Sequence, residues 1–279
     1  MTTSFRSGML VLCLIPGLLV SGCSDGSAEQ EAPDVAVTNS YLESVVRDLG
    51  GSQTQVMCLA PPGMCPGHFD ISPAQVRQLR NCRMLLLFDF QAQVEAALAR
   101  LKDNGLQTHL VKASTGLCVP DSYLDACREV AAVLAQAYPE RADALALRLT
   151  EIEQRLNILS DALRSDVTDS GAAAAPVLTS HHQAQFAEWL GLNVVATFVG
   201  SDTETIASVD HCLKQAAGHD VRFVIANQQE GTALAQALAE RLKARAVVFS
   251  NFPPQVTGEP GFDRLLRDNV ARLLEASAE

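Results

Sequence analysis

Basic residues are scarce in this chain. Its 279 residues include 21 Lys and Arg against 32 Asp and Glu, which gives a formal net charge of −11. Nucleic-acid binding needs clustered Lys and Arg to neutralise phosphates, and attraction to an anionic membrane surface needs a polybasic segment. The composition therefore argues against a nucleic-acid partner and against a polybasic membrane contact.

The sequence also lacks the short motifs that mark common catalytic sites. It contains no Gly-rich phosphate loop, no G-x-S-x-G nucleophile elbow and no H-E-x-x-H zinc motif. Asp70 and Asp121 lie at or just before predicted helix starts, where a carboxylate caps backbone N–H groups. We therefore expect a protein that is not an enzyme.

Cysteine is too sparse to act as the main scaffold of the fold. Of the eight cysteines, Cys13 and Cys23 lie near the N-terminus, which leaves six in the remainder. These six are Cys58, Cys65, Cys82, Cys118, Cys127 and Cys212. No C-x-x-C pair occurs, so a thioredoxin-like redox site has no support. Hydrophobic residues make up 48% of the chain, enough to build a large core in one or two domains.

The N-terminus has the pattern of a bacterial lipoprotein signal. Arg6 precedes an apolar run at 9–20 that is too short for a membrane span, and the segment LVSG stands just before Cys23. We expect cleavage before Cys23 and lipidation of its thiol; an ordinary signal peptide followed by a chance cysteine is the alternative. Export places the folded part in an oxidising compartment outside the cytoplasm.

Strand-like and helix-like segments alternate along the rest of the chain. In the first half, expected strands at 34–39, 54–60, 83–90 and 108–113 are separated by expected helices at 40–51, 73–82 and 92–105. The second half repeats this alternation after a break at 169–176. Alternating strands and helices indicate an α/β fold with mainly parallel sheets.

One long helix is predicted between the two halves. No Pro or Gly occurs between 140 and 166, and apolar residues recur there at steps of three and four: Leu145, Leu149, Ile152, Leu156, Leu159 and Leu163. A helix of this length spans about 40 Å at 1.5 Å per residue. A coiled-coil dimer would give the same stripe, but a helix laid across two lobes explains it at least as well.

The expected fold class is therefore α/β, with two Rossmann-like lobes of mainly parallel strands joined by one long backbone helix. The expected boundaries are a lipoprotein signal peptide at 1–22, a flexible tether at 23–33, an N-terminal lobe at 34–138, the linking helix at 139–168 and a C-terminal lobe at 169–279.

Five stretches match a known family in their order and spacing: DVAVTNSYLESVVRDLGG, LAPPGMCPGHFDISPAQVRQLRNCRMLLLFD, YLDACREVAAVLAQAYPERADAL, SHHQAQFAEWLGLNVVATF and FVIANQQEGTALAQALAERLKARAVVFSNFPP. They resemble the solute-binding proteins of bacterial zinc and manganese ABC importers, the cluster A-I or ZnuA/TroA-like family. The resemblance implies a lipid-anchored protein in the periplasm or at the cell surface. It also implies a monomer that captures a transition-metal ion between two lobes and delivers it to an ABC importer permease.

The resemblance also implies where the metal ligands of the N-terminal lobe lie. In the segment that matches the first ligand motif, Gly67 occupies the ligand position and His68 follows it. Thr115 occupies the second position, and Cys118 lies three residues later. Cys65 is a further donor near the first position.

In the C-terminal lobe, the resemblance places His181 and His182 at the third ligand position, with a spacing one residue away from the usual pattern. The fourth position, usually acidic, falls near Asn251, and Asn227 replaces the usual Glu of another family segment. Loss of carboxylates argues against manganese, whereas imidazole and thiolate favour zinc or a copper ion. The expected tetrahedral set, with Zn²⁺ as the first choice and Cu⁺ as the second, is drawn from His68, His181, His182, Cys65 and Cys118.

Two alternatives remain open at this stage. In an oxidising compartment, a disulfide that involves Cys65 or Cys118 is slightly favoured over metal ligation, and Cys58 with Cys65 is another pair. The departures at the ligand positions also allow the same fold to bind a different ligand, such as a metal complex or a small solute. An extracytoplasmic thiol or redox protein using Cys65 and Cys118 is the third class.

Overall fold

The described part of the chain comprises residues 1–2, 33–51, 54–60, 71–98, 105–114, 116–200 and 206–278 of a computed structural model. The chain divides into two units, Met1–Glu31 and Ala32–Glu279, and the second contains all the helices and strands described below. The expected signal peptide, the lipidation site Cys23 and nearly all of the tether lie outside the described residues. Among the described helices, none combines the length and apolar character that a membrane span requires.

The first half of the chain forms a four-stranded parallel sheet. Its strands are β1 (Val35–Val37), β2 (Val56–Cys58), β3 (Met84–Phe88) and β4 (Gln107–Val111), in the order β2-β1-β3-β4. The intervening helices are α1 (Ser40–Gly50), α2 (Pro73–Leu79), the short 3-10 helix η1 (Asp89–Gln91) and α3 (Ala92–Ala97). All five residues of β3 are buried, as expected for a parallel strand covered on both faces.

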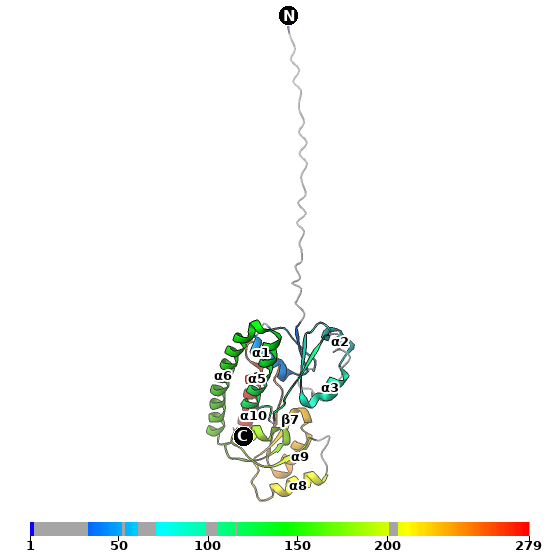
Figure 1. Cartoon of the computed structure of the whole chain (residues 1–279). Helices are drawn as coiled ribbons and strands as arrows, with labels where there is room; N and C mark the ends of the chain where they lie inside the picture. Colours follow the sequence, from blue (N-terminus) through cyan, green and yellow to red (C-terminus); the bar gives the residue numbers. More distant parts are fainter. Residues whose placement is uncertain are drawn as a thin grey trace. The chain divides into compact units, whose positions relative to one another are not determined.

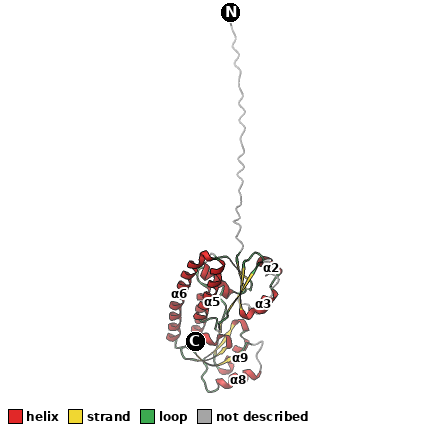
Figure 2. Cartoon of the chain, viewed as in Figure 1, coloured by secondary structure: helices red, strands yellow, loops and turns green. Residues whose placement is uncertain are grey.

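The second half forms another parallel sheet with the same pattern of strand order. Its strands are β5 (Pro176–Ser180), β6 (Asn193–Phe198), β7 (Phe223–Asn227) and β8 (Arg245–Phe249), in the order β6-β5-β7-β8. Its helices are η3 (His181–Gln183), α7 (Ala184–Trp189), α8 (Ile206–Ala216), η4 (Gln228–Glu230), α9 (Ala233–Leu242) and α10 (Gly261–Ala278). Figure 2 shows the strands of the folded part lying between helices. The predicted α/β fold with two parallel sheets is confirmed.

The predicted linking helix is also confirmed. After α5 (Pro120–Ala137) and η2 (Pro139–Arg141), α6 runs as one helix of 28 residues over Ala142–Asp169. Its buried stripe packs on α5 and α1 of the first half and on α10 of the second, and Figure 1 shows α6 running alongside these helices. The apolar stripe is therefore covered within the chain itself, so no coiled-coil partner is needed to explain it.

Aromatic side chains join the two halves in one shared core. Tyr123 of α5 stacks on Phe262 of α10, with ring centroids 3.9 Å apart and an interplanar angle of 10°. Tyr41 of α1 packs edge-on against both rings. Burial of large aromatic surfaces is a major source of stability, so the lobes are held together by a common apolar centre.

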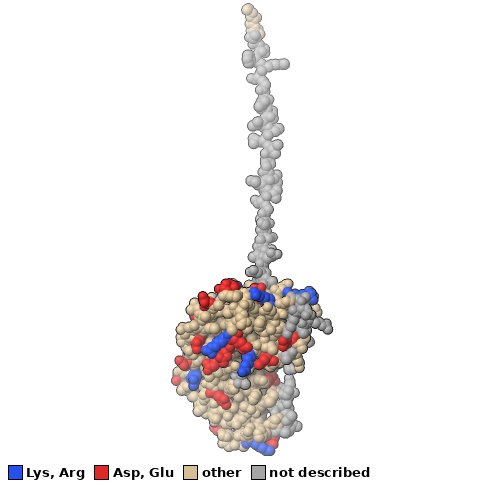
Figure 3. All heavy atoms as spheres, viewed as in Figure 1, with Lys and Arg blue, Asp and Glu red and all other residues tan. Residues whose placement is uncertain are grey.

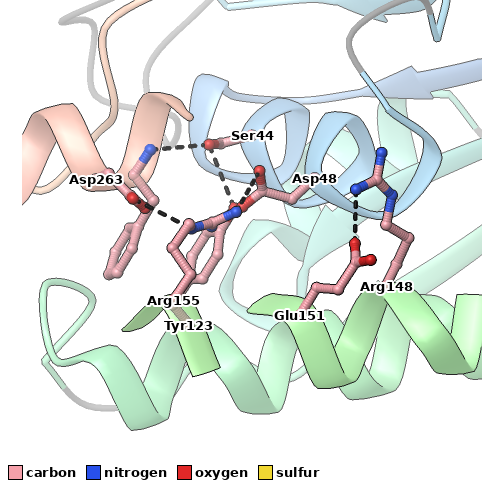
Figure 4. A network of polar contacts seen from close by, with 8 residues as sticks. Ser44, Asp48, Tyr123, Arg148, Glu151, Arg155 and Asp263 are labelled. Atoms are coloured by element: carbon pink, nitrogen blue, oxygen red, sulfur yellow. Dashed lines mark hydrogen bonds and ion pairs between the residues drawn. The ribbon is translucent and has the colours of Figure 1, made fainter. Parts of the chain in front are cut away.

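A buried charge network lies next to this aromatic core (Figure 4). Arg155 of α6 reaches Asp48 of α1 and Asp263 of α10, and the two carboxylate side chains are only 8% and 4% exposed. The hydroxyl of Tyr123 donates a further hydrogen bond to Asp48, at 2.8 Å. Residues from both lobes and from the linking helix thus share one polar cluster.

Candidate functional site

The candidate site begins where strands β5, β7 and β8 end. In open parallel sheets, ligands bind beyond the carboxyl ends of the strands. His181 and His182 follow β5 directly and form the start of η3. The Ser180 hydroxyl caps this turn by accepting a hydrogen bond from the His182 backbone N–H at 3.3 Å. The structure therefore brings the two predicted histidines to a strand end, and both are exposed.

The imidazole of His182 is anchored by a carboxylate. Its Nδ1 lies 2.5 Å from Glu230 Oε1, and the Ser180 hydroxyl donates to Glu230 Oε2, also at 2.5 Å. The hydrogen bond to Glu230 raises the pKa of His182 above its ordinary value, although partial burial opposes this. Burial disfavours ionisation of Glu230, yet the hydrogen bonds from His182 and Ser180 outweigh it and lower the pKa of Glu230.

The two histidines stand beside one another on this turn. Their ring centroids are 6.0 Å apart, and the ring planes meet at 79°. Two imidazoles at such a spacing are near enough to contribute to one metal ion after small side-chain rotations, since Zn–N bonds are about 2.0–2.1 Å. The pair therefore offers two nitrogen donors from one short segment.

Cys118, just before the start of α5, lies away from solvent. It is 0% exposed, and its thiol donates to the Ser250 carbonyl at 3.0 Å and to Asn251 Oδ1 at 3.4 Å. The Asn269 amide donates to the sulfur at 3.6 Å. Burial raises the pKa of the Cys118 thiol far above its ordinary value. The sulfur thus serves as a hydrogen-bonding bridge from the N-terminal lobe to the C-terminal lobe.

The favoured disulfide is wrong for Cys118, and so is the alternative pair that involves Cys58. Both side chains are free thiols in the structure. Burial and the neighbouring Glu43 raise the pKa of Cys58 to about 12. A reactive cysteine needs a lowered pKa and some exposure, so the environment of Cys118 also argues against the thiol or redox class.

Neutral amides occupy the strand ends next to the histidines. The Gln183 amide nitrogen donates to Asn227 Oδ1 at 3.2 Å and to Asn251 Oδ1 at 2.9 Å, and all three side chains are buried. Gln183 Oε1 has no hydrogen-bond partner among the described residues. The Asn251 backbone N–H donates to Gln229 at 3.1 Å. This cluster carries no charge, in agreement with the loss of carboxylates noted from the sequence.

Several predicted ligands cannot be placed relative to this cluster. His68 and Cys65, with Gly67 and Thr115, lie outside the described residues. Within the described residues, no three His, Cys, Asp or Glu side chains are grouped so that they could hold a metal ion. In the part of the chain that the structure describes, the histidine pair therefore supplies two imidazole donors and no complete metal site is formed.

Sequence reasoning missed the roles of Glu230 and Gln183. Gln183 lies on the same short turn as the histidines, and this position could have indicated that its side chain lies near the site. Glu230 lies three residues after the end of β7, on η4, where the strand end brings it to the same edge of the sheet as Ser180. Neither residue belongs to the ligand positions that the family resemblance implied.

A separate cavity of about 940 Å³ lies along α1, α6 and the loop at 254–261. Its buried Glu43 is paired with Arg47 at 2.9 Å and accepts a hydrogen bond from Gln255 at 2.6 Å. Arg155, also in its wall, is bound to Asp48. Figure 3 shows acidic and basic side chains lying next to one another on the face that it draws. Because Glu43 and Arg155 in the wall of the cavity are already paired within the protein, the histidine pair is the stronger candidate site.

Comparison with known proteins identifies the family. A model described as "Zinc-uptake complex component A periplasmic" matches residues 35–276. The crystal structure of ZnuA shares 16% sequence identity at a TM-score of 0.69, covering 88% of this chain and 99% of that chain. No curated protein sequence matches.

Two further structures have the same fold. A cadmium-bound periplasmic metal-binding protein from Candidatus Liberibacter asiaticus has 14% identity and a TM-score of 0.71, covering 87% of this chain and 98% of that chain. A zinc-bound ZnuA deletion mutant has 15% identity and a TM-score of 0.68, covering 88% and 98%. Because the family model spans well over half of the sequence, the chain belongs to the family of zinc-uptake complex component A periplasmic proteins.

Proposed function

We propose that this protein is the extracytoplasmic solute-binding component of an ABC importer and that its cargo is Zn²⁺. Its family is one of periplasmic proteins of zinc uptake, and related structures have been solved with zinc, cadmium or manganese bound. The observation that carries the proposal is the histidine pair at the end of β5, where Nδ1 of His182 is anchored on Glu230 and the His182 side chain is 59% exposed. The protein captures and hands over the ion without covalent chemistry.

The proposed ligands come from both lobes. His181 and His182 supply imidazole nitrogens from the C-terminal lobe, and His68 and Cys65 supply donors from the N-terminal lobe. Three imidazoles with one thiolate supply the four donors of a tetrahedral Zn²⁺ site. Cys118 is left out of this set because its sulfur is buried and hydrogen-bonded.

Zinc is proposed over manganese because of the donor chemistry. Mn²⁺ prefers carboxylate and other oxygen ligands, whereas imidazole and thiolate suit Zn²⁺ and copper. The strand ends beside the histidines carry the neutral Asn227 and Asn251. Cu⁺ is the second metal to test, because a thiolate ligand also suits it.

Metal analysis and titration calorimetry on the soluble fragment from Ser24 onward test this proposal. We expect one Zn²⁺ per chain with a sub-micromolar Kd. The double substitution His181→Ala/His182→Ala should abolish tight binding, whereas His219→Ala, which changes an exposed histidine elsewhere, should leave it unchanged. Absence of binding by any first-row metal, with the fragment folded, would overturn the proposal.

We also propose that Cys23 is lipidated after removal of residues 1–22, which tethers the monomeric protein to a bacterial membrane next to its permease partner. The supporting observation is the short apolar run followed by LVSG and cysteine. Labelling with a fatty-acid analogue should modify the wild-type protein and leave Cys23→Ser unmodified. Release of the wild-type protein in soluble, unmodified form would contradict this anchoring.

A second candidate ligand is a small neutral solute or a metal complex that donates hydrogen bonds. The observation that favours it is the buried Gln183 Oε1, which lacks a partner among the described residues and lies in a cluster of neutral amides. A thermal-shift screen of metal complexes and polar solutes, in parallel with bare metal ions, separates the two. A Tm increase with a solute and none with Zn²⁺ would favour this candidate.

A further inference from the structure

We infer that Glu230 is a positioning residue that fixes the orientation and the tautomer of the His182 imidazole, so that Nε2 is presented to a metal ion. The inference rests on the proposed function, in which His182 is a zinc ligand. Glu230 itself is not counted among the ligands. Its role is to hold the ring from the inner side.

The two carboxylate oxygens of Glu230 contact different partners, His182 and Ser180. Oε1 lies 2.5 Å from His182 Nδ1, and Oε2 accepts from the Ser180 hydroxyl at 2.5 Å. The carboxylate side chain is only 17% exposed, whereas the imidazole is 59% exposed. The ring is therefore anchored at Nδ1 on a mostly buried carboxylate, while more than half of the imidazole side chain is exposed.

This contact determines which ring nitrogen carries the proton. An ionised carboxylate only accepts hydrogen bonds, so the Nδ1 that faces Glu230 must be the protonated nitrogen. In the neutral imidazole, the lone pair then lies on Nε2. None of the described residues hydrogen-bonds to His182 Nε2. A metal binds an unprotonated nitrogen, so the neutral form of the anchored ring offers Nε2 to a metal.

Glu230 is held in place by residues at or just after the carboxyl ends of three strands. Ser180 ends β5, and Asn227 of β7 gives Glu230 a further hydrogen bond. Gly200, just after β6, packs so closely that an added Cβ would lie 2.3 Å from the Glu230 Cβ and 3.0 Å from its carbonyl oxygen. Only glycine fits at that contact. Glu230 thus has its carboxylate hydrogen-bonded by Ser180 and Asn227 and its Cβ packed against Gly200, which suits it to orient a neighbouring imidazole.

A carboxylate that hydrogen-bonds to a metal-ligating histidine affects metal affinity in proteins generally. A carboxylate that orients a ligating histidine raises its basicity, and removal of such a partner weakens metal binding about 10- to 100-fold. We expect a loss of this size when Glu230 can no longer act as an acceptor-only partner.

The test compares Glu230→Gln with the wild-type protein by two measurements. Long-range ¹H–¹⁵N correlation spectra of the metal-free protein, at a pH where His182 is neutral, report its tautomer. Competition titration reports the Kd for Zn²⁺. We expect the Nδ1–H tautomer in the wild type, a mixture of tautomers in Glu230→Gln, and a zinc Kd that is about 10- to 100-fold higher in the variant.

Two further variants keep the test decisive. Ser180→Ala removes one hydrogen bond to Glu230 and should produce a smaller weakening in the same direction; it also serves if Glu230→Gln fails to fold. Glu188→Gln changes an exposed acidic residue of the same lobe and should alter neither measurement.

The outcomes separate this inference from the proposed function. If the wild type binds zinc and Glu230→Gln shows the same Kd and tautomer, the positioning role is wrong and the proposed function stands. If the wild type binds no zinc while the tautomer still changes in Glu230→Gln, the proposed function is wrong. In that case Glu230 orients the ring but serves no zinc site, and the inference falls with the function.

Discussion

The guanidinium of Arg155 lies 2.7 Å from the carboxylate of Asp48, and this contact joins the linking helix α6 to helix α1 of the N-terminal lobe. The same guanidinium reaches Asp263 of α10 in the C-terminal lobe, at 3.1 Å. Removal of one partner from a buried ion pair leaves an uncompensated charge. The charge of the single Arg155 side chain thus compensates one buried carboxylate from each lobe.

Replacement of Arg155 by Met should destabilise the protein markedly. Two mostly buried carboxylates would lose their cation, at a cost of about 2–4 kcal/mol, somewhat below that of a fully buried pair because Arg155 is 30% exposed. Equilibrium urea denaturation measures the change. Arg148→Met is the matched control, because Arg148 and its partner Glu151 are about half exposed and their pair contributes under about 1 kcal/mol. Equal losses in both variants would contradict the account.

Asp263 should make stability depend on pH. Burial raises its pKa above the ordinary value of 3.8, because Arg155 and Arg267 compensate only in part and Asp48 adds a like charge. The carboxyl group of Asp263 therefore binds a proton more readily in the folded state than in the unfolded state. This contribution is fully present below the ordinary pKa and is lost as pH rises through the raised pKa of the folded state.

Asp263→Asn should remove this pH dependence. An amide cannot ionise, and its oxygen still accepts a hydrogen bond from Arg155. Relative to the wild type, the variant should gain free energy of unfolding as pH rises from about 4 to neutrality, as followed by urea denaturation at a series of pH values. Asp161→Asn, at an exposed position, is the control. A variant that loses stability relative to the wild type as pH rises would refute this assignment.

Cys118→Ala should reduce stability without changing zinc affinity. The substitution removes the hydrogen bonds of the thiol to Ser250 and Asn251, at a cost of about 1–2 kcal/mol. Because the sulfur is not a proposed ligand, the Kd for Zn²⁺ should stay within about twofold. By contrast, Cys65→Ala should weaken zinc binding at least tenfold. Calorimetry on both variants decides between the two cysteines, and a large rise in Kd for Cys118→Ala would restore Cys118 to the ligand set.

Local patterns in the sequence were sufficient to predict much of the fold. The three- and four-residue spacing of Leu145 to Leu163 predicted one helix at 140–166, and α6 runs over Ala142–Asp169. The continuous apolar run in β3 predicted a strand covered on both faces, and it is fully buried. Such features depend on neighbouring residues alone, so periodicity and burial reveal them.

The contacts of the candidate site join residues that are far apart in the sequence. Glu230 and His182 are 48 residues apart, and Cys118 and Asn251 are 133 residues apart, so no local pattern links them. The sequence predicted that the histidines end a strand and that Asn227 and Asn251 bring no charge. It did not predict that Glu230 anchors His182, nor that Cys118 is buried in a bridge between the lobes, because both depend on how the two sheets place their strand ends.

The central claim is that the histidine pair belongs to a zinc site, and the binding stoichiometry of the purified fragment from Ser24 onward tests it most directly. The protein should be stripped of metal and titrated with Zn²⁺ alone, and the titration repeated with His181→Ala/His182→Ala. The account predicts one tightly bound Zn²⁺ per wild-type chain and none in the double variant. One tightly bound Zn²⁺ in both proteins, or in neither, would contradict it.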